Sequence, residues 1–169
     1  MSISIVQLQD IDIEDLFEFE LENRGFFEEM VPTRGDDYYI LNTFRKKHEA
    51  LLEEQTQGIS YFYLIKDIRS SIIGRMNLVY IDENQKLGHI GYRVGQAHIG
   101  KGVANNALKL LLETMIVKDL KQIKAKTTTT NIASQKVLEK NGFKFIECSD
   151  EEFEMNGQKL KFIHYIWTK

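Results

Sequence analysis

The chain has 169 residues, of which 43% are hydrophobic and 28% are charged, and its formal net charge is −3. This length and composition predict a single globular domain over residues 1–169 that is large enough to bury a full hydrophobic core. We expect neither membrane insertion nor secretion nor nucleic-acid binding, because the chain has no apolar run of about 20 residues, no signal-like start and no dense basic run.

The first third of the chain is predicted to form a strand and two helices. Residues 2–9 alternate loosely between apolar and polar side chains, which is typical of a strand. Asp10 is a candidate cap for a helix that extends to about Asn23. A second helix is expected from Asp36 to about Gln55, ending near Gly58, and residues 24–35, with glycines on both sides of the only proline, are predicted to be a loop.

Strands and one strongly amphipathic helix follow. Three strands are expected at residues 59–66, 72–81 and 87–94, joined by polar turns. A helix begins near Lys101, because its small and apolar side chains fall on one stripe. That stripe consists of Ala104, Ala107, Leu108, Leu111, Leu112 and Met115.

The last part of the chain is predicted to add a strand, a helix and a hairpin. The short strand covers residues 123–128, and the helix begins at Asn131 and ends at Gly142, beyond which Phe143 can contact Leu138. Residues 143–154 and 160–167 are expected to form one hairpin around Asn156-Gly157.

A glycine-rich segment at residues 95–104, GQAHIGKGVA, is a candidate phosphate-binding loop. It lies between a predicted strand and a predicted helix, where glycines let backbone N–H groups approach an anion and the helix N-terminus adds its dipole. One interpretation is a nucleoside-triphosphate loop, because Gly95, Gly100 and Lys101 fit G-x-x-x-x-G-K. Gly102 replaces the Ser or Thr that should hold Mg²⁺, and Thr127 to Thr130 supply no acidic metal ligand, which weakens this interpretation.

The same loop resembles the pyrophosphate loop of the GNAT N-acetyltransferases, Q/R-x-x-G-x-G/A. Gly102 and Ala104 fill the last two signature positions, whereas Ile99 stands where Gln or Arg is expected. Residues 131–143, NIASQKVLEKNGF, are similar to the family segment N-x-x-S-x-x-V-L-x-K-x-G-F, and residues 89–92, HIGY, are similar to its E-I-G-Y strand. The serine and the I-G-Y strand resemble the branch of ribosomal-protein alanine N-acetyltransferases of the RimJ/RimL type.

The resemblance implies a fold and an activity. The fold is the α/β (α+β) GNAT fold, with a mixed, mostly antiparallel seven-stranded sheet, splayed central strands and about four helices. The activity is transfer of an acetyl group from acetyl-CoA, without a metal, by direct attack of a primary amine in a ternary complex. The implied acceptor is the N-terminal amine of a protein or peptide, as in ribosomal proteins. A small-molecule amine (polyamine, amino acid or antibiotic), a CoA-binding module without catalysis, and a homodimer stay open as alternatives.

Residues that would contact the cofactor follow from the resemblance. They are Tyr92, Arg93, Val94, Ile99, Gly100, Lys101, Gly102, Val103, Ala104, Asn131, Ser134 and Lys136. The resemblance places a backbone N–H donor for the thioester oxygen in the strand that ends at residues 92–94, and such a donor is typically worth about 3 kcal/mol. Lys101 and Lys136 are candidates for the cofactor phosphates.

Candidate catalytic residues are Ser134, His89 and Glu28. Leu138 occupies the position of the tyrosine that protonates the leaving thiolate in many family members, so Ser134 is the candidate donor, although serine is also common in a first helical turn. His89 stands where the family often has a glutamate, and imidazole, with a pKa of about 6.5, can accept the proton of the amine. Glu28 and Glu29 are alternative bases, and uptake of neutral amine from solution is a further alternative.

Charge is unevenly distributed along the chain. Residues 1–37 contain eleven acidic and two basic side chains, while the remainder has fourteen acidic and twenty basic ones. A cationic acceptor would favour the acidic segment and a polyanionic cofactor the basic remainder, but a solvated acidic helix face explains the same pattern. The only cysteine, Cys148, can form no internal disulfide, which fits a reducing cytoplasm.

Overall fold

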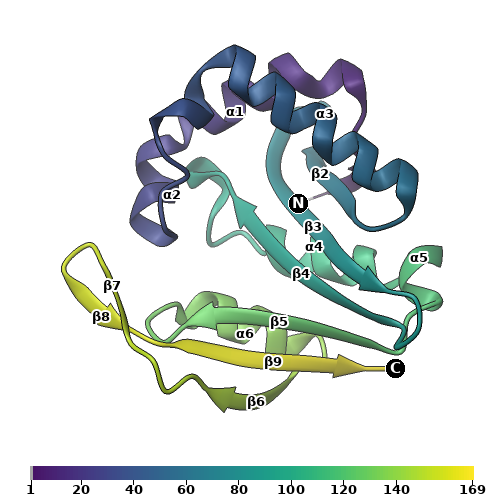
Figure 1. Ribbon diagram of the computed structural model, residues 1–169, viewed down its shortest axis with the longest axis vertical. Coiled ribbons are helices and arrows are strands. Elements are labelled where there is room, and N and C mark those ends of the chain that lie inside the picture. Colours follow the sequence, from purple (N-terminus) through teal and green to yellow (C-terminus); the bar gives the residue numbers. More distant parts are fainter. Residues whose placement is uncertain (1) are drawn as a thin grey trace.

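The computed structural model describes residues 2–169, and its centre is a seven-stranded sheet (Figure 1). The strand order is β1-β2-β3-β4-β5-β9-β6, and neighbours are antiparallel except for β4 and β5. The strands are β1 (Ile3–Gln7), β2 (Tyr61–Asp67), β3 (Ile72–Asp82), β4 (Leu87–Val94), β5 (Gln122–Thr128), β6 (Lys144–Cys148) and β9 (Phe162–Thr168). This confirms the mixed, mostly antiparallel sheet implied by the resemblance.

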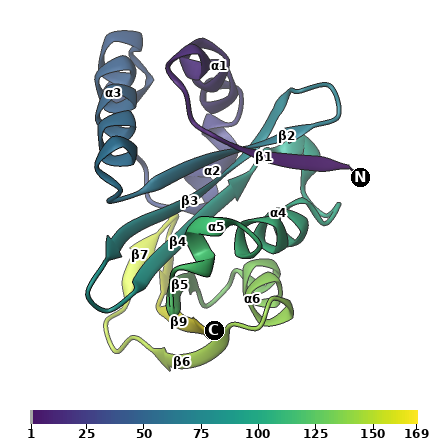
Figure 2. The ribbon, with the colours of Figure 1, turned by 90° about the vertical axis from the view of Figure 1, so that its right-hand side faces the viewer.

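Helices cover both faces of the sheet (Figure 2). One face carries α1 (Ile13–Glu22), α2 (Arg24–Met30) and α3 (Leu41–Gln57), and the other carries α4 (Val103–Leu112), α5 (Met115–Lys118) and α6 (Ile132–Lys140). The sheet therefore separates two cores, and the alternation of strand side chains feeds both. In β2, Phe62 and Leu64 pack with α1 and α3, whereas Tyr63 and Ile65 pack with α4.

The parallel pair β4 and β5 separates part of the way along. Pairing runs from Leu87 opposite Gln122 to Ile90 opposite Ala125 and stops there, although β4 continues to Val94 and β5 to Thr128. Figure 1 shows the two strands diverging beyond this point. The predicted splay of the central strands is thus confirmed, and it opens the sheet at the carboxyl ends of both strands.

The helix prediction was wrong in two places. The predicted loop at residues 24–35 contains α2, because the buried ring of Phe27 packs against Phe19 and because Arg24 and Glu28 form an i,i+4 ion pair of 3.0 Å. Met115, predicted to extend the stripe of α4, begins the separate helix α5 and is exposed. Residues 2–169 contain six α-helices rather than about four, together with 3-10 turns at Asp10–Asp12, Asp36–Tyr39 and Gln96–His98.

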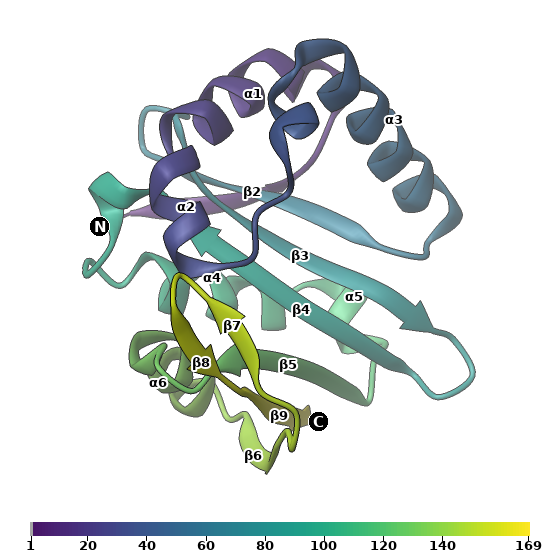
Figure 3. The same ribbon diagram turned by 60° about the vertical axis from the view of Figure 1, so that its left-hand side comes forward.

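The predicted C-terminal hairpin is present, but it is divided into two parts. Asn156-Gly157 does form a two-residue turn, with positive φ at both residues, but it connects β7 (Phe153–Met155) to β8 (Gln158–Leu160) in a ribbon of their own. The other part, β6 paired antiparallel with β9, lies in the main sheet, as predicted for residues 143–154 and 160–167. The ribbon leaves the main sheet and reaches α2, where Asn156 Nδ2 donates to the carbonyl of Glu29 at 3.0 Å (Figure 3).

Candidate active site

A cavity of about 280 Å³ lies at the opening between β4 and β5. Its wall comes from α2, the end of β4, the loop that follows it, and the first turns of α4 and α6. Ten of the residues predicted to contact the cofactor line it, namely Tyr92, Arg93, Val94, Ile99, Gly100, Gly102, Val103, Ala104, Asn131 and Ser134. The segments 99–104 and 131–134, whose nearest ends are 27 positions apart, therefore meet at one site where β4 and β5 separate.

The loop before α4 has the geometry of an anion cradle. Gly100 and Gly102 have φ values of +75° and +77°, in the left-handed region that glycine adopts without strain. Gly102 is the N-cap of α4, and within residues 2–169 no side chain caps this helix. The first N–H groups of α4 therefore face the cavity without a side-chain acceptor, which suits a phosphate.

Side-chain hydrogen bonds join the two edges of the opening. The Asn131 side chain accepts a bond of 3.2 Å from the N–H of Ser134 and so caps α6. The hydroxyl of Tyr92 on β4 lies 3.0 Å from Ser134 Oγ and 3.3 Å from the Ser134 carbonyl oxygen. Burial raises the pKa of Tyr92 to about 12, which keeps this hydroxyl protonated. The sequence predicts a contact of the Tyr92 main chain with the cofactor, but it does not predict the hydrogen bond between the Tyr92 hydroxyl and Ser134.

Four predicted site residues do not line the cavity. Lys101 and Lys136 are exposed. His89 lies beside Lys124 in the register of β4 and β5, and burial, followed by Lys124 and Lys126, lowers the pKa of its ring. The carboxylate of Glu28 is bound to Arg24 at 3.0 Å.

A second hollow, of about 400 Å³, continues from the cavity toward α1 and α3. The two share Tyr92, Arg93, Asn131 and Ser134 in their walls, so they form one cleft through the opening in the sheet. The second hollow is also lined by Arg34, Arg75 and Asn77, which do not line the first cavity. The carboxyl end of the parallel pair is thus open from both faces.

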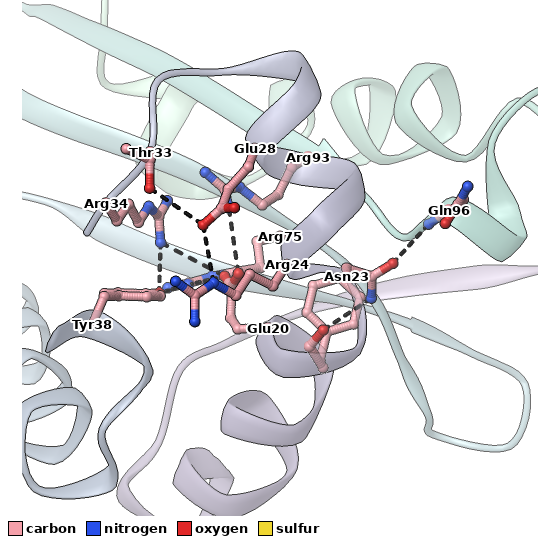
Figure 4. A network of polar contacts seen from close by, with 11 residues as sticks. Glu20, Asn23, Arg24, Glu28, Thr33, Arg34, Tyr38, Arg75, Arg93 and Gln96 are labelled. Carbon is pink, nitrogen blue, oxygen red and sulfur yellow. Dashed lines mark hydrogen bonds and ion pairs between the residues drawn. The ribbon is translucent and has the colours of Figure 1, made fainter. Parts of the chain in front are cut away.

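Three arginines converge on one buried carboxylate beside the second hollow (Figure 4). Glu20 on α1 has no exposed side-chain surface, and its oxygens lie 2.6 Å from Arg75 Nη1, 3.3 Å from Arg93 Nη1 and 3.7 Å from Arg34 Nη1. Burial alone would raise the pKa of Glu20, but the arginines outweigh it and lower that pKa, so the carboxylate is ionised. Tyr38 accepts bonds from Arg34 at 2.5 Å and from Arg75 at 3.2 Å.

Sequence reasoning missed this cluster. Its members come from α1, the segment before α3, and β3 and β4, so no local spacing connects them. The one available signal was the presence of Arg75 and Arg93 inside otherwise apolar strands, where a charged side chain needs a partner.

Comparisons with known proteins agree with this geometry. Residues 3–144 match the family described as Acetyltransferase (GNAT) domain. A curated relative, the probable N-acetyltransferase YjcK of Bacillus subtilis (strain 168), is 30% identical over 161 residues, which cover 92% of this chain and 88% of that protein.

Two solved structures share the fold. The ribosomal-protein-S5-alanine acetyltransferase of Vibrio fischeri superposes with a TM-score of 0.90 at 20% identity, covering 99% of this chain and 93% of the other. A RimL ribosomal L7/L12 alpha-N-protein acetyltransferase, solved with coenzyme A, gives a TM-score of 0.88 at 19% identity, covering 99% and 94%.

Neither a membrane-spanning helix nor a metal-binding group is found among residues 2–169. Among residues 2–169, none of the helices combines the length and the apolar character needed to cross a bilayer. Within the same residues, no group of three or more His, Cys, Asp or Glu side chains is placed to hold a metal ion.

Proposed function

This chain belongs to the family of GNAT acetyltransferases and is an acetyl-CoA-dependent N-acetyltransferase, and we propose that its acceptor is the N-terminal amine of a protein or peptide. The nucleoside-triphosphate interpretation of the loop is set aside with this assignment. The solved proteins of the same fold that acetylate ribosomal proteins support the proposal. We also propose a cytoplasmic location, which the exposed, free Cys148 supports.

An open entrance on the acceptor side is the observation that carries the proposal. A further hollow lies between the end of α2 and the β7–β8 ribbon, and it reaches Asn131 at the edge of the cleft. Glu29, Met155 and Asn156 line it. The ribbon and α2 are joined by the hydrogen bond from Asn156 to Glu29, and we propose that a narrow chain end enters the hollow beside this contact while the rest of the acceptor stays outside.

We assign the chemistry to groups around Ser134. The amine nitrogen attacks the thioester carbon, the carbonyl oxygen becomes negative, and main-chain N–H groups of residues 92–94 stabilise that charge. The C–S bond then breaks, and the leaving sulfur takes a proton through Ser134 Oγ while that oxygen takes one up from water, so that the proton gained by sulfur balances the one lost by the amine nitrogen. Tyr92 lies within hydrogen-bond distance of that oxygen and is protonated, so it can donate to Ser134 while the serine loses its proton.

The proton of the acceptor amine has two candidate acceptors in our proposal. The lowered pKa of His89 keeps its ring neutral at pH 7, as a base requires. Glu28 is ion-paired with Arg24. Neither lines the cleft, so each would act through water, and the entry of neutral amine from solution would need neither.

Acetylation of matched acceptors tests the proposal. Release of free thiol from acetyl-CoA is measured with short peptides that have free N-termini, with the same peptides blocked at the N-terminus, and with spermidine. We expect turnover with the free peptides alone, with mass spectrometry locating the acetyl group on the α-nitrogen. Faster turnover of spermidine, or equal turnover of the blocked peptides through lysine side chains, would contradict the N-terminal acceptor.

A further inference from the structure

The arginine cluster beside the second hollow lacks an anion. Glu20 is shared by Arg34, Arg75 and Arg93, so one negative charge faces three positive ones. The nearby carboxylates of Glu28 and Asp36 are bound to Arg24 instead, at 3.0 and 2.5 Å. Arg75 and Arg93 are largely buried, whereas Arg34 is partly exposed, and the guanidinium groups of Arg34 and Arg93 also stack on Tyr38 and Phe27. Because the two buried charges share one carboxylate, a negatively charged group would compensate the excess positive charge.

The unused donors of these arginines are free for that group. Contacts with Glu20 and Tyr38 use the Nη1 atom of each arginine. The Nε and Nη2 atoms of the three arginines take no part in these contacts. All three side chains line the second hollow together with Lys126, and none of the described residues that line it is acidic.

The sheet leaves room for a ligand next to the cluster. Gly91 lies opposite Asn77 in the pairing of β4 with β3, and a Cβ atom on Gly91 would meet nothing within 4 Å. Asn77 Oδ1 is buried and has no hydrogen-bond partner in the described part of the chain. This oxygen can therefore accept an N–H from an amine lying over Gly91, while Arg75, two residues along the same strand, is about 7 Å away along β3.

We infer that the acceptor carries a carboxylate near its reacting amine, and that Arg34, Arg75 and Arg93 bind this carboxylate. The inference rests on the proposed function and names the class of acceptor for the same cleft. The separation of Asn77 from Arg75 suits a peptide whose first or second residue is Asp or Glu. A free amino acid offers the same chemistry, with a shorter distance between its amine and its carboxylate.

The cluster has a second consequence for the reaction. Burial is the main cause that lowers the pKa of Arg93, and the positive charge of Arg34 adds to it. Burial would also lower the pKa of Arg75, but Tyr38 and Glu20 outweigh it and raise that pKa. The positive charges of Arg34 and Arg93 lower the pKa of an ammonium group bound beside them and so favour the neutral amine that attacks the thioester. These charges also disfavour polyamines. The acidic side chains of residues 1–37 do not neutralise the positive charge of the cluster, because most of them are exposed to solvent. The buried Glu20 supplies one negative charge to three arginines.

A pair of peptides that differ by one group tests the inference. Both have the same free N-terminal residue, with Asp in the second position of one and Asn in the second position of the other. We expect kcat/KM to be about tenfold or more higher for the Asp peptide, as for a hydrogen bond to a charged group. Equal or faster acetylation of the Asn peptide overturns the anion subsite and leaves the N-terminal acceptor intact.

Two variants with equal loss of charge locate the subsite. Arg34→Gln should raise KM for the Asp peptide by about tenfold, with no change for the Asn peptide or in KM for acetyl-CoA. Arg24→Gln is the matched control, because Arg24 is already neutralised by Glu28 and Asp36, and it should keep the preference for Asp. The same loss of preference in both variants would overturn the assignment to this cluster.

Further measurements distinguish the carboxylate of a peptide side chain from that of a free amino acid. Gly91→Val fills the space beside Asn77 and should abolish use of every acceptor while the affinity for CoA, measured by calorimetry, is retained. A free amino acid that is used in preference to its amide and to both peptides would support the anion subsite and overturn the N-terminal acceptor. A preference for spermidine would overturn both.

Discussion

The two sides of the cleft are built in different ways. The cavity that we propose for the cofactor is lined by glycines and short side chains from residues 99–104 and 131–134, together with side chains of α2 and the end of β4. The second hollow, which we propose for the acceptor, is lined by long charged side chains from the segment before α3, β3 and β4, and these are held by Glu20 on α1. The first construction depends on local backbone conformation, and the second depends on the register of distant elements.

This difference predicts how substitutions on each side affect ligand affinity and folding. A change in a contiguous loop should affect ligand affinity more than folding, because the loop lies at the surface of the sheet. A change in the buried cluster should affect folding first, because removing one partner leaves other charges buried without compensation. Four variants test this contrast.

Loss of the shared carboxylate should have the largest effect. Glu20→Ala leaves three arginines without their common partner, and we expect the free energy of unfolding to fall by about 3–5 kcal/mol. Glu22→Ala, on the exposed face of the same helix, is the control and should change it by less than about 0.5 kcal/mol. Urea denaturation followed by circular dichroism measures both, and similar values for the two variants would contradict the structural role of the cluster.

Ser134→Ala should affect turnover and leave stability almost unchanged. Without the hydroxyl, the leaving sulfur loses its proposed proton donor and Tyr92 loses its side-chain partner, so we expect kcat to fall by about 100-fold. KM for acetyl-CoA should hardly move. Steady-state thiol release measures both constants, with Ser71→Ala on the exposed turn after β2 as the control. Unchanged turnover in Ser134→Ala would remove the proposed proton donor.

Gly102→Val should weaken CoA binding through the backbone. A Cβ at this position would approach no atom closer than 4.0 Å, so the cost arises from the φ of +77°, at about 1–2 kcal/mol. Because the loop would shift to relieve this strain, we expect about tenfold weaker binding by calorimetry. Gly25→Ala, in α2 with no positive φ and no atom within 4 Å, should bind CoA normally. Normal binding by both variants would argue against the cradle.

The smallest expected effect is on the pH dependence of stability. Burial lowers the pKa of His48 from 6.5, and its Nε2 lies 3.0 Å from the carbonyl oxygen of Gln9. The unfolded chain therefore takes up a proton first as the pH falls below about 6.5, and the folded state loses stability there. His48→Gln should show a flatter dependence of melting temperature on pH between about 7 and 5. An unchanged slope would assign the effect to other groups.

The cofactor side could be predicted from the sequence because its groups are close together along the chain. The spacing of Gly100, Gly102 and Ala104 already defines a left-handed loop that leads into a helix, and Asn131 with Ser134 defines a cap. Lys101 and Lys136 are exposed and do not line the cavity, so their contact with the cofactor phosphates stays a prediction.

The acceptor side could not be predicted in this way. Glu20 and Arg75 are 55 residues apart, and their contact requires the packing of α1 on the sheet. The helix α2 was hidden by Gly25, which is usually a helix breaker, although Phe27 supplies the burial that holds it. The pairing of β6 with β9 follows the predicted hairpin, but the turn at Asn156-Gly157 does not indicate that the hairpin is divided into two parts.

The short pairing of β4 with β5 should make hydrogen exchange in β4 sensitive to bound CoA. Four residue pairs join these strands, so the amides of β4 beyond Ile90 that point toward β5 have no ladder to protect them from hydrogen exchange. A pantetheine chain lying in the opening would supply the missing acceptors. Exchange at Gly91–Val94 should therefore slow on addition of CoA, while the paired residues Leu87–Ile90 change little.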